Sequence, residues 1–170
     1  MSLDLYLRTK TPIKHKMGEG KGNYSSAGGF TRALSYDEVK KMWPDYKIPF
    51  DPDEEYEDDE YWWANITHNL GKMASHCPTV DGKYTLYELL WRPSENGFEI
   101  VTPDYIDYVK EGFMYLLTNK TDLLQYNPPI DPETGKRWGS YELFVDFVKD
   151  YIIALCSYSY EEELTIYASV

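Results

Sequence analysis

The side chains best suited to chemistry lie between residues 61 and 77, where amides, imidazoles and an amine recur at helical spacing. Drawn as one helix, with about 100° between successive residues, the segment separates into two faces. The apolar face carries Trp62, Ile66, Leu70, Met73 and Cys77. The polar face carries Asn65, His68, Asn69, Lys72, Ser75 and His76. We predict a helix from near Asp59 to Cys77, ended by Pro78 and anchored by its apolar face.

The polar face of this predicted helix favours binding over catalysis. Asn65, His68, Asn69 and Lys72 are candidate contacts for a ligand or a partner, although both asparagines could instead serve the fold by hydrogen-bonding a neighbouring backbone. His68 could act as a general base, but the sequence places no acid, nucleophile or oxyanion donor beside it. His68 and His76 would be roughly 12 Å apart along a helix and could not share a metal ion. We therefore assign no catalytic residue, no metal ligand and no cofactor.

A basic, glycine-rich region follows the start of the chain, and we expect an excursion from the domain over residues 10–34. Lys14, Lys16 and Lys21 are its candidate contacts, and five glycines there would let backbone amides approach an anion closely. The spacing of the glycines matches neither a P-loop nor a dinucleotide-binding turn. Contact with an anion or nucleotide and a surface hairpin that meets a partner both remain open.

Residues 51–60 contain eight carboxylates in ten positions. Three interpretations fit this acidic run. Its last members could stabilise the N-terminus of the predicted helix. It could bind calcium, although it lacks the glycine and the distal glutamate of an EF-hand loop. It could also mimic nucleic acid by placing carboxylates where a DNA-binding enzyme expects phosphates.

Trp91 and Arg92 form a further candidate site, because an indole beside a guanidinium could make a cation-π lid over a pocket. The alternative is that Trp91 anchors the core. The two cysteines, Cys77 and Cys156, each lie on an apolar helical face, so we expect both to be buried thiols.

The remaining pattern predicts a single α+β domain over residues 1–170, with four to five helices packed on a small sheet. Apolar and polar residues alternate over 2–8 and 164–170, which predicts two strands that pair with each other. Three further helices begin after the predicted caps Ser35, Thr102 and Ser140. A short helix is expected over 85–91, before Pro93.

Composition limits the partners. The net charge of -12 argues against direct nucleic-acid binding, because phosphate neutralisation needs clustered Lys and Arg. No apolar run is long enough to span a membrane, and no leader pattern opens the chain, so we expect a cytoplasmic protein. The oligomeric state stays open.

Four short segments occur in order along the chain: Ser-Leu-Asp-Leu-Tyr-Leu at 2–7, Ala-Asn-Ile-Thr-His-Asn-Leu-Gly-Lys-Met-Ala at 64–74, Leu-Leu-Trp-Arg-Pro at 89–93 and Trp-Gly-Ser-Tyr-Glu at 138–142. In these segments the chain resembles a family of small, largely uncharacterised proteins of bacteriophages and prophages. The resemblance spans nearly the whole length, and Asn-Ile-Thr-His-Asn-Leu is its most specific part. It implies an accessory phage protein without an assigned reaction, and it supplies no catalytic residues.

Because binding needs only a complementary surface, the expected function is a non-catalytic binding protein that acts on a host protein in the infected bacterium, for example as an anti-defence inhibitor. Three alternatives stay open. The chain could sequester a small anionic ligand such as a signalling nucleotide, if the polar face and the basic region meet in one pocket. It could be a small hydrolase or transferase, with His68 as base and Lys16 or Lys21 on a phosphate. It could be the acidic nucleic-acid mimic.

Overall fold

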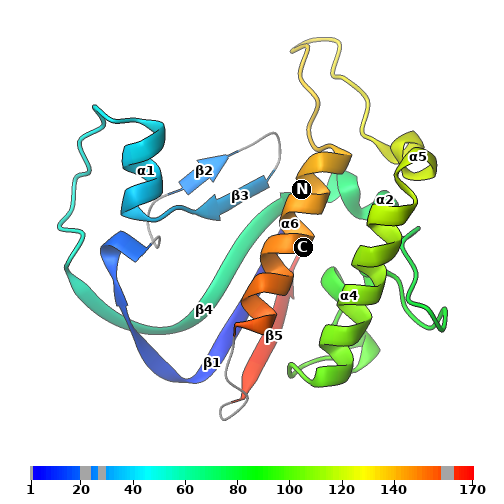
Figure 1. The fold of residues 1–170 in the computed structure, drawn as a ribbon, viewed down its shortest axis with the longest axis horizontal. Coiled ribbons are helices and arrows are strands. Elements are labelled where there is room, and N and C mark those ends of the chain that lie inside the picture. The colour runs from blue at the N-terminus through cyan, green and yellow to red at the C-terminus, as the bar shows by residue number, and fades with distance from the viewer. Residues whose placement is uncertain (1, 20–23, 27–29, 158–162) are drawn as a thin grey trace.

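The protein is an α+β domain built on a five-stranded antiparallel sheet (Figure 1). This computed structural model describes residues 2–19, 24–26, 30–157 and 163–170. The strand order is β2-β3-β4-β1-β5. The strands are β1 (Ser2–Lys16), β2 (Tyr24–Ser26), β3 (Phe30–Ala33), β4 (Glu55–Thr67) and β5 (Leu164–Ser169).

Among the described residues, four of the six helices begin directly after a capping side chain. The helices are α1 (Tyr36–Met42), α2 (Gly71–Ala74), α3 (Leu86–Leu90), α4 (Pro103–Thr118), α5 (Lys120–Leu123) and α6 (Tyr141–Cys156). Ser35, Thr85, Thr102 and Ser140 each accept a hydrogen bond from the backbone N–H three residues ahead. This satisfies one of the donors that a helix start leaves without a partner. The predictions of α1, α3, α4 and α6 are therefore confirmed.

The two ends of the chain meet in the sheet, as predicted. Leu3, Leu5 and Leu7 of β1 are fully buried, while the residues between them are half-buried. β5 runs antiparallel to β1, with Asp4 opposite Ser169 and Thr9 opposite Leu164. The alternation of residue types marked the buried face of each strand correctly because side chains in a strand point to opposite faces in turn.

The predicted helix over 59–77 is wrong. β4 occupies Glu55–Thr67, and only a 3-10 turn (His68–Leu70) and the short α2 follow it. Leu3 of β1 and Phe30 of β3 both lie opposite Ile66, so β4 is paired on both sides. Ala64 and Ile66 are fully buried. Two neighbouring strands therefore supply hydrogen bonds that an isolated segment would have found only in a helix.

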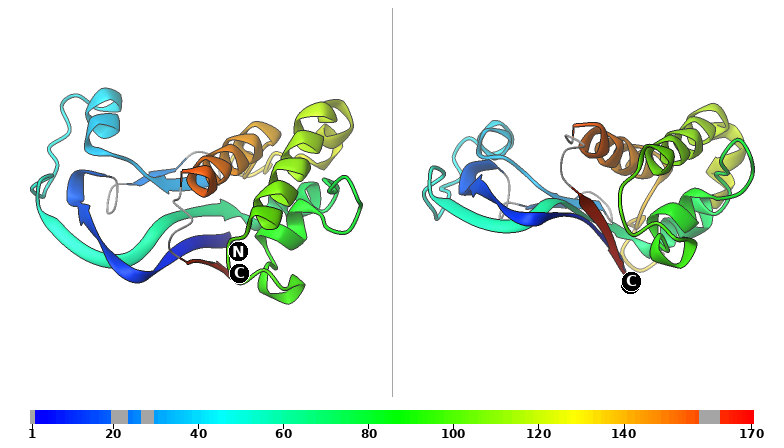
Figure 2. Two further views of the ribbon diagram at one scale, coloured as in Figure 1. Left: turned by 60° about the horizontal axis from the view of Figure 1, so that its bottom comes forward. Right: turned by 90° about the horizontal axis from the view of Figure 1, so that it is seen from below.

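Helix α6 packs on this sheet, against β4. Figure 2 shows α6 lying across the long strands with α4 beside it. Tyr151 of α6 and Tyr105 of α4 are fully buried, and their hydroxyl oxygens lie 2.8 Å apart. Tyr105 donates to the Leu89 carbonyl at 2.8 Å, so Tyr151 is the donor to Tyr105. Burial raises the pKa of both phenols.

Beyond the helices, β1 and β4 continue together as a curved two-stranded ribbon, which we call the β1–β4 arm (residues 10–16 and 55–60) (Figure 1). The expected excursion over 10–34 thus begins as strand. The pairing register shifts between Arg8 and Ile13. Past this shift, Lys14 lies opposite Glu57, and Lys16 lies opposite Glu55.

Candidate functional site

A depression of about 360 Å³ lies where β4 ends and the chain turns into α2. We call it the His68 depression. Its lining residues are His68, Asn69, Gly71, Lys72, Ser75 and Tyr87. All but Tyr87 come from one short stretch of chain, and Tyr87 comes from α3.

A capping hydrogen bond and buried side chains fix the backbone of this stretch. The Thr67 hydroxyl accepts a hydrogen bond from the Asn69 N–H at 3.3 Å and caps the 3-10 turn. Leu70 and Met73 are fully buried in the core. A Cβ on Gly71 would lie 3.3 Å from the Tyr87 ring, so glycine allows the ring to approach the backbone closely. The depression therefore has a rigid base.

His68 is held in one tautomer. The Trp91 indole N–H donates to His68 Nδ1 at 3.0 Å. Because an indole nitrogen is only a donor, Nδ1 carries no proton, and the neutral ring keeps its proton on Nε2. In this form His68 presents a hydrogen-bond donor, and neither ring nitrogen is free to take a proton from a substrate while the bond to Trp91 lasts.

Trp91 is a core residue and forms no lid. Its side chain is 2% exposed, stacks on Tyr87 with centroids 5.6 Å apart and packs against Phe144. Arg92 instead lies over the Tyr87 ring, 6.0 Å from its centroid, and donates to the Tyr87 hydroxyl at 3.3 Å. Arg92 also forms an ion pair with Glu95 at 2.8 Å.

Lys72 is the cation of the depression. Its ammonium lies 5.8 Å from the centroid of the Tyr126 ring. It forms no ion pair with any residue in the part of the chain that the structure describes. The His76 ring also stacks on Tyr126, with ring centroids 4.0 Å apart.

The structure brings some of the predicted site residues together and separates others. His68, Asn69 and Lys72 share the depression even though they are not on one long helix. Asn65 lies on β4 and donates to the Asp4 carboxylate at 2.8 Å, a structural contact. Lys14 and Lys16 lie on the β1–β4 arm. Lys21 lies outside the described residues.

Gly71 and Tyr87 also line the depression, and the sequence pattern did not predict either of them as site residues. One signal was present, because Tyr87 and Trp91 are four residues apart and such aromatic pairs meet on one helix face. The prediction that both cysteines are buried is correct for Cys77 and wrong for Cys156. Cys77 is fully buried, and burial raises the pKa of its thiol to about 12. Cys156 is exposed, because Leu155 takes the core position in the last turn of α6.

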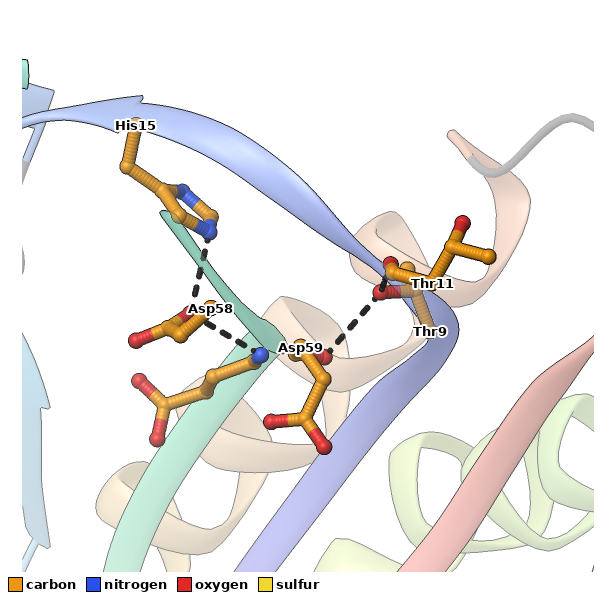
Figure 3. A network of polar contacts seen from close by, with 6 residues as sticks. Thr9, Thr11, His15, Asp58 and Asp59 are labelled. Carbon is orange, nitrogen blue, oxygen red and sulfur yellow. Dashed lines mark hydrogen bonds and ion pairs between the residues drawn. The ribbon is translucent and has the colours of Figure 1, made fainter. Parts of the chain in front are cut away.

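The β1–β4 arm holds a second polar cluster (Figure 3). His15 Nε2 lies 3.2 Å from an Asp58 carboxylate oxygen, and the His15 ring stacks on Tyr56. The Thr9 hydroxyl lies 2.6 Å from the Thr11 carbonyl and 3.3 Å from that of Asp59. The contacts of His15 with Asp58 and Tyr56, and of Thr9 with Asp59, join β1 to β4 and stabilise the arm.

Comparison with models of known protein families, with curated proteins and with solved structures finds no match to this chain. No helix within the described residues is long and apolar enough to cross a membrane. In the same part of the chain, no three His, Cys, Asp or Glu side chains gather as a metal site would require.

Proposed function

We propose that this chain is a non-catalytic binding protein, and that the surface around the His68 depression binds a host protein inside an infected bacterium. The observation that carries this proposal is the Trp91–His68 hydrogen bond. It leaves His68 as a donor rather than a general base. The Ser75 hydroxyl donates to the Lys72 carbonyl at 2.7 Å, and His76 Nδ1 lies 3.2 Å from that hydroxyl. Because His76 Nδ1 itself donates to the Lys72 carbonyl at 2.8 Å, it carries a proton and cannot take one from Ser75 to activate it as a nucleophile.

The rim of the depression supports a protein partner. Trp138 is half exposed, and its carbonyl accepts a hydrogen bond from the Asn69 amide at 3.4 Å. Tyr87 lines the depression and contacts Arg92, and Tyr126 contacts Lys72, so both tyrosines belong to the same surface. Tyrosine, tryptophan and arginine are the side chains that most often dominate the binding energy of protein interfaces.

The alternatives draw less support from the geometry. Sequestration of a nucleotide, and hydrolysis or transfer with Lys16 on a phosphate, both need the arm lysines beside His68. Those lysines lie opposite Glu55 and Glu57 on the arm instead. The same pairing works against an acidic nucleic-acid mimic, because lysines lie directly across from part of its carboxylate run. The resemblance to phage accessory proteins is the basis for placing the partner in an infected host.

Affinity capture from infected bacteria tests the proposal. The tagged wild-type chain is expected to retain a host protein, and Trp138→Ala is expected to lose it. Trp43→Ala is the matched control, since Trp43 at the end of α1 is similarly exposed, 47% against 50% for Trp138. Equal capture by both variants, or no host protein on the wild-type chain, would overturn the proposal.

A further inference from the structure

The charge around the His68 depression is unusual for this molecule. The chain has 29 acidic and 17 basic residues, yet no carboxylate of the described residues lines this depression. Two other depressions on the described surface differ. The larger, of about 610 Å³ beside α4, includes Glu111, and another at α4 includes Asp104, Asp107 and Glu111. An acidic protein therefore leaves one described hollow free of negative side chains.

The cation in that depression is also uncompensated. Elsewhere, Arg92 pairs with Glu95, and Lys120 lies 3.7 Å from Glu142. Among the described residues, Lys72 contacts only the face of Tyr126, and a contact with an aromatic ring leaves the ammonium N–H groups free to donate. A compact ammonium without a carboxylate partner favours an anion at this position.

Two neutral donors accompany Lys72. His68 keeps its proton on Nε2, because Nδ1 accepts from Trp91. The Tyr87 hydroxyl accepts from Arg92 Nε, so its own proton is available to donate. Glu95 reaches this network only through Arg92, which neutralises it. The remaining polar groups, the Ser75 hydroxyl and the Asn69 amide, already donate to backbone carbonyls.

We infer that the His68 depression binds an anionic group of the partner, a carboxylate or a phosphate, between Lys72, His68 and Tyr87. This inference rests on the proposed function, since it names the chemistry that the same surface recognises. Charge-assisted hydrogen bonds from an ammonium are stronger than neutral ones, and oriented neutral donors on a rigid base add direction. An acidic side chain and a phosphorylated residue both supply this chemistry.

Titration of the isolated protein, followed by the NMR signals of the Lys72 and His68 side chains, tests the inference directly. The probes are acetate and inorganic phosphate at constant ionic strength, with acetamide as the neutral control. We expect saturable shifts with at least one anion and none with acetamide. The anion with the tighter saturation identifies the source as a carboxylate or a phosphate. Shifts that fail to saturate with both anions would overturn the inference.

Matched variants locate the site. Lys72→Gln is expected to weaken anion binding roughly tenfold, the loss of one charge-assisted contact. Lys110→Gln removes a lysine that lines both depressions containing Glu111, and it is expected to leave binding unchanged. His68→Gln keeps an N–H donor and should bind more tightly than His68→Ala. Equal weakening by Lys72→Gln and Lys110→Gln would overturn the inference.

The capture experiment separates this inference from the proposed function. If anions bind at Lys72 but no host protein is retained, the proposed function fails and the anion site stands. If Trp138→Ala loses the host protein while Lys72→Gln retains it at wild-type level, the proposed function stands and the inference fails.

Discussion

The His68 depression and the β1–β4 arm are both polar, but they differ in how their basic side chains are placed relative to carboxylates. On the arm, Lys14 and Lys16 lie directly across from Glu57 and Glu55, and His15 meets Asp58. In the depression, Lys72 has no carboxylate among its neighbours in the lining. Basic residues of the arm therefore lie opposite acidic ones. The lone cation marks the candidate site better than the charge runs that dominate the sequence.

The two regions also differ in what lies beneath them. The depression rests on Leu70, Met73 and Trp91, which are almost completely buried. Most residues of the arm are exposed or half-buried, because no core lies under them. Regions with few buried apolar contacts open at low free-energy cost, whereas regions on the core open only with the whole fold. The depression is therefore the more suitable of the two for holding donors in fixed positions.

Alkaline pH should have the largest effect, because it favours ionisation of tyrosines that are buried in the core beneath the depression. Burial raises the pKa of Tyr105 and Tyr151 above the ordinary value of 10.0. A raised pKa stabilises the fold fully below that ordinary value, and the stabilisation is lost as the pH rises above it. We expect cooperative unfolding above about pH 10, with late phenolate absorbance from these two residues. Ionisation of every tyrosine while circular dichroism stays native would contradict this.

Gly139→Ala should destabilise the base of the depression by about 2–4 kcal/mol. Gly139 has a φ of +100°, and a Cβ there would lie 2.7 Å from Thr67 Cγ2, beside the 3-10 turn. Gly135 in the same loop has a φ of +68° with open space around it, so Gly135→Ala should cost only about 1–2 kcal/mol. Urea denaturation measures both. Equal costs would show that contact with Thr67 does not restrain the turn.

Trp91→Phe should cost about 1–2 kcal/mol and release the His68 tautomer. The phenyl ring retains apolar packing but has no N–H for Nδ1. Ring-nitrogen NMR should then detect a proton on Nδ1 in part of the population, and acetate binding should weaken. Trp138→Phe, at an exposed position, should leave the ring signals as in the wild type. An unchanged His68 tautomer in Trp91→Phe would remove the argument against a general base.

Glu57→Lys places two lysines opposite each other on the arm and should cost less than about 1 kcal/mol, because the pair is exposed. It should not alter anion binding at Lys72. Thermal unfolding and the acetate titration provide the two measurements. A change in acetate affinity would show that the arm and the depression are coupled rather than separate.

Cysteine labelling should leave stability almost unchanged and report on burial alone. Iodoacetamide is expected to modify the exposed Cys156 in the native protein. Cys77 should stay unmodified until unfolding, because its thiol is buried and its pKa is raised to about 12. Peptide mapping after brief labelling distinguishes the two. Modification of Cys77 under native conditions would mean that the chain beside the depression opens locally.

The sequence by itself determined the elements whose signals are local. Ser35, Thr102 and Ser140 marked helix starts because the capping hydrogen bond joins residues only three apart. The strict alternation at the two ends of the chain marked β1 and β5. The sequence also identified His68, Asn69 and Lys72 as neighbours, since they lie within five positions and any compact turn keeps them close.

Only the tertiary structure decided the conformation of residues 55–67. Trp62 and Ile66 fit a helical face at a spacing of four and a strand face together with Ala64 at a spacing of two, so periodicity alone could not choose. Backbone pairing with β1 and β3, which are distant in sequence, made it a strand. The same pairing placed Lys14 and Lys16 opposite Glu57 and Glu55, away from His68, because cross-strand register follows from long-range contacts.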